Sequence, residues 1–276
     1  MTTTAAPTAQ ILSTARTFLF VPGNRPERFD KAAGAGADVV IIDLEDAVSP
    51  DDKPAARAHI AEWFGAGNSA VIRINAAGTP WHDDDVALAQ RLSAPVVLAK
   101  AQFPDEVAAV AAATGAPVIP LVETARGILT TPAIADLDGV VRIAFGAIDF
   151  AVQVGADPED REALLFARST LATASAAAGI GAPVDGVTTA LRDTDKLVDD
   201  VTYAARIGLT GKLCIHPAQV ATVHTCLAPS EEEIAWARSI LDAASSDSSA
   251  VAVDGHMVDS PVVARAERIV AAITSA

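Results

Sequence analysis

The stretch Val39-Val-Ile-Ile-Asp-Leu-Glu-Asp46 begins as a short apolar run and ends in acidic residues. A run of this length, rich in β-branched and aliphatic residues, is typical of a strand that is buried on both faces. Comparable runs recur along the chain, giving eight with Val39–Leu44 included. The other seven are Phe18–Val21, Ala70–Ile74, Pro95–Ala99, Val118–Val122, Val141–Phe145, Pro183–Val187 and Lys212–Ile215.

The segments between these runs are rich in Ala, Leu, Glu and Arg, as expected for helices. Examples are Pro104–Ala113, Asp160–Ala178 and Asp195–Ile207. Eight strand-then-helix units in succession predict a parallel (β/α)₈ barrel, the TIM barrel fold. A doubly wound open sheet is the alternative, but no G-x-G-x-x-G motif follows an early strand.

The length and composition fit one barrel and exclude some partners. The 276 residues are normal for a single α/β barrel. No apolar run reaches the roughly 18–20 residues of a membrane span, so we expect no membrane partner. A net charge of −15 argues against a nucleic-acid partner, because such binding needs a basic face. Cys214 and Cys226 form no disulfide framework or zinc pattern, which suits a reducing cytoplasm.

The two ends of the chain lie outside the barrel pattern. Residues 1–17 are rich in Thr and Ala and lack the apolar core of a signal peptide, so we expect a disordered start. Residues 18–228 would form the catalytic barrel. Ser230-Glu-Glu-Glu233 is a capping box that predicts a helix to about Ala243. A polar, flexible-looking segment at 245–250 and a last helix at 261–273 would complete a C-terminal helical lid or arm over residues 229–276.

Polar residues follow every apolar run from the second onward, at the strand ends where barrel enzymes build their active sites. Two carboxylates on successive strand ends, Glu123 and Asp149, could share Mg²⁺. Arg73 is then the natural counter-charge for an anionic substrate. Glu45 and Asp46 could accept hydrogen bonds from metal-bound water, or could form ion pairs with neighbouring Arg or Lys. The remaining strand-end residues are Asn75, Lys100, Asp185 and His216.

A series of motifs in this order resembles the citrate lyase β-subunit-like branch of the HpcH/HpaI aldolase family, which includes malyl-CoA and citramalyl-CoA lyases. The resemblance covers about residues 18–269. Its motifs are Phe18-Leu-Phe-Val-Pro-Gly-Asn-Arg-Pro-Glu-Arg-Phe29, Asp43-Leu-Glu-Asp-Ala-Val48, Val71-Ile-Arg-Ile-Asn75, Leu121-Val-Glu-Thr-Ala125, Phe145-Gly-Ala-Ile-Asp149, Gly211-Lys-Leu-Cys-Ile-His-Pro217 and Asp254-Gly-His-Met-Val-Asp-Ser-Pro261.

The resemblance implies a carbon–carbon lyase that breaks or forms a β-hydroxyacyl-CoA thioester, with a 2-keto acid as the second reactant. It implies that Glu123 and Asp149 bind Mg²⁺, with Mn²⁺ as a substitute. Arg73 would bind substrate and stabilise the thioester enolate, and Asp259 would be the acid–base group that a neighbouring subunit's lid delivers. The implied assembly is a homotrimer or a multiple of it. The residues implied to contact coenzyme A or the acyl group are Phe20, Arg25, Lys31, Ile215 and His216.

One departure concerns Ile148, which stands before the metal Asp where many relatives have Glu or Ala. It bears on the choice of acyl group rather than on metal binding.

Other functions fit the same residues. The chain could act on a carrier-bound acyl group as the β subunit of a citrate lyase complex, or could be a class II pyruvate-type aldolase without CoA. Lys100 could form a Schiff base, although surrounding carboxylates would raise its pKa and oppose that chemistry. A barrel retained only for binding is the non-enzymatic alternative.

Overall fold

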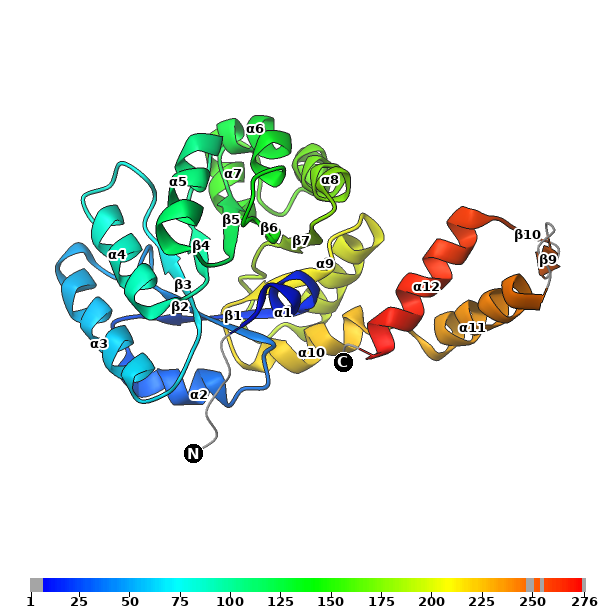
Figure 1. The fold of residues 1–276 in the computed structure, drawn as a ribbon, viewed down its shortest axis with the longest axis horizontal. Helices are drawn as coiled ribbons and strands as arrows, with labels where there is room; N and C mark the ends of the chain where they lie inside the picture. The colour runs from blue at the N-terminus through cyan, green and yellow to red at the C-terminus, as the bar shows by residue number, and fades with distance from the viewer. Residues whose placement is uncertain (1–6, 247–250, 254–255, 275–276) are drawn as a thin grey trace. The chain divides into compact units, whose positions relative to one another are not determined.

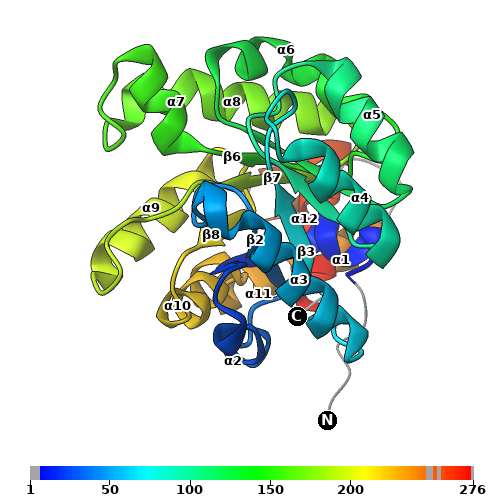
Figure 2. The ribbon, with the colours of Figure 1, turned by 90° about the vertical axis from the view of Figure 1, so that its left-hand side faces the viewer.

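In a computed structural model, eight parallel strands form a closed barrel, as the alternating pattern predicts. The structure describes residues 7–246, 251–253 and 256–274. Strand β1 pairs with both β2 and β8, which closes the barrel, and Figure 2 shows the helices surrounding the strands. The strands are β1 (Thr17–Pro22), β2 (Val39–Asp43), β3 (Val71–Ile74), β4 (Val96–Leu98), β5 (Val118–Val122), β6 (Arg142–Phe145), β7 (Gly181–Asp185) and β8 (Gly211–Cys214).

Helices follow the strands along the chain, and two of them, α7 and α8, separate β6 from β7 (Figure 1). Asp160 caps the start of α8, where its carboxylate accepts hydrogen bonds from the N–H groups of Glu162 and Ala163. The helices of this part of the chain are α1 (Ala9–Thr14), η1 (Pro26–Arg28), α2 (Phe29–Ala33), η2 (Pro50–Asp52), α3 (Lys53–Gly65), α4 (His82–Leu92), α5 (Pro104–Thr114), α6 (Ala125–Ala135), α7 (Ala147–Val154), α8 (Arg161–Ala178), α9 (Thr194–Arg206) and α10 (Ala218–Leu227).

Inward-pointing aliphatic and aromatic side chains fill the barrel. Because successive strand residues face opposite sides, about every second residue of each strand enters this core. The core is solid at the middle of the barrel, so a ligand can enter only at its ends. The buried members are Leu12, Ala15, Phe18, Val39, Ile41, Val71, Val97, Ile119, Leu121, Ala144, Val184 and Leu213.

The prediction of a disordered start is wrong for residues 9–17. Ala9–Thr14 form helix α1, and Leu12 is completely buried. The buried guanidinium of Arg142, on β6, donates hydrogen bonds to the carbonyl oxygens of Leu12 (3.3 Å) and Ala15 (2.5 Å). The composition suggested disorder, but the buried Leu12 and the internal Arg142 hold this helix against the barrel. Residues 1–6 lie outside the described residues.

A second compact unit, Leu227–Ala276, follows the first, Met1–Cys226; the sequence predicts this boundary at 228/229. It contains α11 (Glu231–Ser246), β9 (Val251–Val253), β10 (His256–Val258) and α12 (Ser260–Thr274). The predicted capping box is present: Ser230 and Glu233 exchange hydrogen bonds of 2.9 and 3.1 Å. The unit has a small core of its own: Ala237, Ile240, Val258 and Ala266.

Two predicted features of this unit fall partly on undescribed positions. Of the expected flexible segment 245–250, residues 247–250 lie outside the described residues, as do residues 254–255 of the last motif. No helix among the described residues is long and apolar enough to cross a membrane.

Candidate active site

A cavity of about 460 Å³ opens at the carboxyl end of the barrel, where the site was predicted. Its lining combines charged side chains with apolar ones. Both predicted metal ligands and the predicted counter-charge, Arg73, line the same space. The complete lining is Phe20, Pro22, Asp43, Asp46, Ala47, Arg73, Leu121, Glu123, Phe145, Gly146, Ala147, Ile148, Asp149, Val187, Leu213 and Ile215.

Arg73 is held by Asp43, its register partner on the neighbouring strand. The Nε and Nη2 groups of Arg73 donate to the two carboxylate oxygens of Asp43 at 2.6 and 2.7 Å. The same carboxylate accepts the backbone N–H groups of Glu45 (2.8 Å) and Ala47 (3.0 Å). Burial alone would lower the pKa of Arg73, but the charge and hydrogen bonds of Asp43 raise it above its ordinary value. Arg73 is therefore a fixed, permanently charged group.

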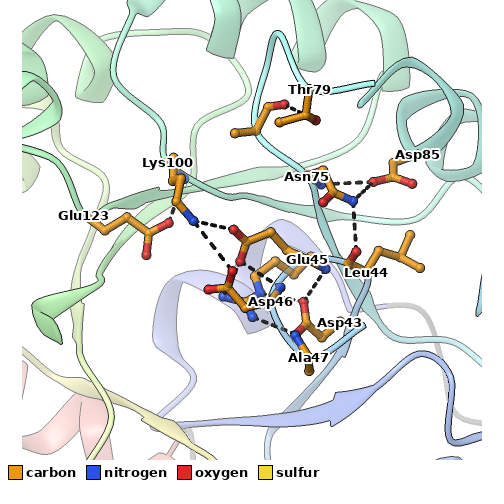
Figure 3. A network of polar contacts seen from close by, with 12 residues as sticks. Asp43, Leu44, Glu45, Asp46, Ala47, Asn75, Thr79, Asp85, Lys100 and Glu123 are labelled. Carbon is orange, nitrogen blue, oxygen red and sulfur yellow. Dashed lines mark hydrogen bonds and ion pairs between the residues drawn. The ribbon is translucent and has the colours of Figure 1, made fainter. Parts of the chain in front are cut away.

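Glu45 lies between two cations. Its Oε2 is 3.1 Å from Nη1 of Arg73, and its Oε1 is 2.5 Å from Nζ of Lys100 (Figure 3). This is the ion-pair arrangement that the sequence left open for Glu45. Asp46 is exposed and lies 3.8 Å from the Lys100 ammonium.

Lys100 does not suit Schiff-base chemistry. Burial alone would lower the pKa of Lys100, but the hydrogen bond and charge of Glu45 raise it above the ordinary value. The amine is therefore protonated at neutral pH, whereas a nucleophilic lysine must lose its proton.

Glu123 is a buried carboxylate at the end of β5. Its Oε1 accepts the backbone N–H of Lys100 at 2.8 Å, and its exposed fraction is only 2%. Gly146 leaves room for it, because a Cβ at that position would collide with the Glu123 carboxylate. Burial, together with the nearby charges of Glu45 and Asp149, raises the pKa of Glu123 to about 8. Such a site favours a cation, which would offset both burial and like-charge repulsion.

Asp149 is the second carboxylate, in the first turn of α7 and exposed at the cavity. Among the described residues, no group of three or more His, Cys, Asp or Glu could hold a metal. Two carboxylates are nevertheless enough for Mg²⁺, which commonly keeps several of its six positions for water and substrate oxygens. The donor set therefore fits Mg²⁺ and leaves room for a ligand.

The other predicted contact residues separate into two groups. Phe20, Ile148 and Ile215 line the cavity, and the Phe20 ring centre is 4.8 Å from the Arg73 guanidinium carbon. Arg25 and Lys31 are exposed and are not among the lining residues. Arg25 pairs with Glu27 at 2.6 Å.

The last two predicted residues are also outside the lining. His216 is exposed, and its Nδ1 accepts the backbone N–H of Ala218 at 3.1 Å, so it orders the rim. Asp259 lies in the second unit, where its Oδ1 accepts the N–H of Val262 at 3.1 Å and caps α12.

Lys53 and Asp85 were not predicted from the sequence, although their side chains bind the backbone next to the cavity residues. The buried ammonium of Lys53 donates to the carbonyls of Leu44 (2.7 Å) and Glu45 (2.9 Å) and to Asn75 Oδ1 (2.9 Å). Asn75 in turn donates to Leu44 O and to Asp85 (Figure 3). Lys53 and Asp85 each stand among acidic residues, typical of a solvated helix start. Asp43 could have been found, because it ends a buried strand beside Arg73.

The closed barrel, its rim carboxylates and the fixed arginine define an enzyme of the (β/α)₈ class. Residues 16–217 match the HpcH/HpaI aldolase/citrate lyase family, and residues 167–272 match a family of carbon–carbon bond lyases of the TIM-barrel fold. The chain belongs to the HpcH/HpaI aldolase/citrate lyase family, which confirms the resemblance.

Named relatives are similar over nearly the whole chain. A citrate lyase subunit beta-like protein of Mycobacterium tuberculosis is 41% identical, with 91% of this chain and 92% of that protein covered. The mitochondrial citramalyl-CoA lyase of Rattus norvegicus is 30% identical, with 94% and 86% covered. A crystal structure of CitE from M. tuberculosis, in complex with magnesium, acetoacetate and coenzyme A, has a TM-score of 0.83 at 36% identity, with 95% and 99% covered.

Proposed function

We propose that this chain is a Mg²⁺-dependent lyase that cleaves or forms a carbon–carbon bond in a β-hydroxyacyl-CoA thioester such as malyl-CoA or citramalyl-CoA. One observation carries the proposal: Glu123, Asp149 and Arg73 line a single cavity at the carboxyl end of the barrel. The reaction needs a cation that binds the keto acid and a fixed positive group that stabilises the enolate. Glu123 and Asp149 would bind the cation, and Arg73 would be the positive group.

Glu123 and Asp149 would hold the Mg²⁺ ion. When bound, Mg²⁺ supplies a Lewis acid that makes the carbonyl of a 2-keto acid electrophilic. The chain itself keeps Glu123 oriented through the N–H of Lys100 and keeps the space open at Gly146. Support comes from the M. tuberculosis CitE complexes, which contain magnesium with acetoacetate, pyruvate or oxaloacetate.

Arg73 would stabilise the negative charge that develops on the thioester oxygen when the neighbouring carbon loses a proton. Its fork is already fixed by Asp43, so it need not reorganise during the reaction. Three of its nitrogens contact Asp43 and Glu45, and a guanidinium has five N–H donors, so donors remain for the substrate. In the cleavage direction the β-hydroxyl loses its proton and becomes the carbonyl of the keto acid, and the carbon–carbon bond breaks to leave the enolate. One proton must then reach the enolate carbon, which balances the proton lost from the hydroxyl.

Asp259 is our proposed donor of that proton. Of the carboxylates that line the cavity, Asp43 pairs with Arg73, and Glu123 and Asp149 would bind the cation. The remaining one, Asp46, is exposed. Asp259 belongs to the second compact unit. The sequence predicts that residues 229–276 form a lid that reaches a neighbouring subunit. The corresponding assembly would be a homotrimer or a multiple of it.

The CoA portion would lie across the rim. Phe20 and Ile215 line the cavity and would contact the acyl group or thioester. Arg25, Lys31 and His216 are exposed, so they would meet the phosphates and pantetheine in solvent, Arg25 by exchanging its surface ion pair with Glu27. Ile148, beside Asp149, adds an apolar side chain to the wall and would bear on which acyl group fits.

The test is an assay of the purified protein alone with malyl-CoA and citramalyl-CoA, following release of glyoxylate or pyruvate. We expect cleavage that chelation abolishes and that Mg²⁺ or Mn²⁺ restores, and no cleavage by Glu123→Ala. Activity in excess chelator, or inactivation by borohydride in the presence of substrate, would instead indicate Lys100 chemistry. Activity only on a carrier-bound acyl group would assign the citrate lyase subunit function.

A further inference from the structure

Lys100 has an unusual backbone for its residue type. Its φ is +51°, a left-handed value that costs free energy in residues with a side chain. Among the described residues other than glycine, only Ser93 shares a positive φ, also +51°. Ser93 ends helix α4, where a left-handed residue is common. Lys100 ends no helix, so its conformation needs another explanation.

Lys100 interrupts the alternation by which the backbone of β4 bonds to β3 on one side and to β5 on the other. The N–H of Ala99 donates to Ile74 O of β3 at 3.3 Å, whereas the N–H of Ala101 donates to Leu121 O of β5 at 3.1 Å. The N–H of Lys100 lies between these two and donates to neither strand. It donates to Glu123 Oε1 at 2.8 Å. The left-handed residue thus directs one backbone donor at one carboxylate.

That carboxylate is enclosed on its other side as well. A Cβ at Gly146 would collide with Oε2 of Glu123, so this oxygen lies against the glycine backbone. The Lys100 ammonium donates its hydrogen bond to Glu45 Oε1, as Figure 3 shows. The hydrogen bond between Lys100 and Glu123 is therefore made by the backbone N–H of Lys100 and not by its ammonium.

We propose that Lys100 is a positioning residue whose left-handed backbone fixes Glu123 for binding a divalent cation. The inference rests on the proposed function, because it takes Glu123 as a cation ligand. The positioning of Glu123 is assigned to the backbone φ of Lys100, and the Lys100 ammonium has the separate role of neutralising Glu45.

The experiment compares substitutions that lack the ammonium equally but differ in backbone preference. Lys100→Gly and Lys100→Asn accept a left-handed φ readily, the β-branched Lys100→Val disfavours it, and Lys100→Ala keeps a backbone preference close to that of lysine. Ser93→Gly and Ser93→Val form the matched control at the same φ. The readout is direct Mn²⁺ binding without substrate, by electron paramagnetic resonance and calorimetry, with circular dichroism to check folding.

Removing a positive charge near a cation site should not weaken cation binding, so we expect Lys100→Gly and Lys100→Asn to match or exceed the parent affinity. Lys100→Val should weaken it about 10-fold or more, and the Ser93 pair should change nothing. If Lys100→Val does not fold, the smaller β-branched variant Lys100→Thr carries the comparison, and Lys100→Ala should bind like the parent. Equal Mn²⁺ affinity in the glycine variant and the β-branched variant would overturn the inference alone. A loss of Mn²⁺ affinity of the same size in the glycine, asparagine, valine and alanine variants would assign the effect to the ammonium and would also overturn the inference. A parent protein that binds no Mn²⁺ would overturn the proposed metal site itself.

Discussion

Arg73 and Asp43 form a two-pronged ion pair across neighbouring strands, with contacts of 2.6 and 2.7 Å between nitrogens and oxygens. Both side chains are largely buried, and Asp43 has no accepting capacity left toward the cavity once it also accepts two backbone N–H groups. Asp43 is thus placed to orient Arg73 rather than to meet substrate.

The first prediction concerns Asp43→Asn. An amide cannot accept both donors of the Arg73 fork, so the guanidinium should lose its fixed direction. We expect kcat to fall by on the order of 10²-fold, the usual effect of displacing a positioned group by about 1 Å. Steady-state kinetics would measure it, with the exposed Asp83→Asn as the control. Unchanged kcat in a folded Asp43→Asn protein would mean that Arg73 needs no support from Asp43.

The second prediction concerns Arg73→Lys, which keeps the positive charge but loses the planar fork. Activity should fall by on the order of 10²-fold, by analogy with the loss of one oxyanion donor. Arg25→Ala should mainly raise KM for the CoA thioester, because Arg25 is exposed and outside the cavity. Comparing kcat with KM in the two variants separates chemistry from anchoring. Parent-like kinetics in Arg73→Lys would place Arg73 away from the reacting centre.

The strand pattern allowed the barrel to be predicted because burial on two faces leaves a local signature. Runs such as Val118–Val122 are apolar throughout, and their order in the sequence is their order in the barrel. The rim positions of Glu123 and Arg73 could be predicted for the same reason, since Glu123 follows such a run and Arg73 is the next-to-last residue of another. The fold and the family were confirmed.

The partners of those residues could not be predicted, because pairing depends on register and on side-chain direction. Lys53 is the first residue of α3 and follows two acidic residues, and nothing local shows that its ammonium turns inward to Leu44 O. Likewise, α1 was missed because its anchor, Arg142, lies far along the chain. The roles of Arg25, Lys31 and His216 stay predictions.

The third prediction is a pH dependence of the cation-free protein. The pKa of Glu123 is about 8 in the folded protein, against an ordinary 4.5. Between these values the folded state keeps a proton that the unfolded state has lost. Stability should therefore fall as pH rises from about 4.5 to about 8, by on the order of a few kcal/mol at most.

Thermal unfolding in chelator at several pH values would measure this fall. Glu123→Gln should flatten it, because the amide does not ionise, and Mg²⁺ should reduce it by binding the ionised form. A melting temperature that keeps the same pH slope in Glu123→Gln would show that other groups, such as Glu45, cause the fall; burial raises the pKa of Glu45 as well.

The last prediction joins assembly to mechanism through Asp259. This residue caps α12 through a hydrogen bond from Val262 N–H to Oδ1, and Asn is as good a cap as Asp. Asp259→Asn should therefore keep the fold of the second unit while losing the exchangeable proton. We expect it to bind Mg²⁺ and acyl-CoA and to lose about 10²–10⁴ in turnover, the range for a positioned general acid–base. Truncation after Ala244 should have the same effect.

Subunit mixing then asks which chain supplies the proton. Glu123→Ala subunits lack the cation ligand, and Asp259→Asn subunits lack the acid, so each assembly alone should be inactive. If a neighbour's lid completes each site, mixed assemblies should recover part of the activity, because some sites pair an intact Glu123 with an intact Asp259 from another chain. Light scattering and differently tagged subunits would establish that mixed assemblies form. Mixed assemblies that form and stay inactive would mean that Asp259 acts within its own subunit, or that it is not the proton donor.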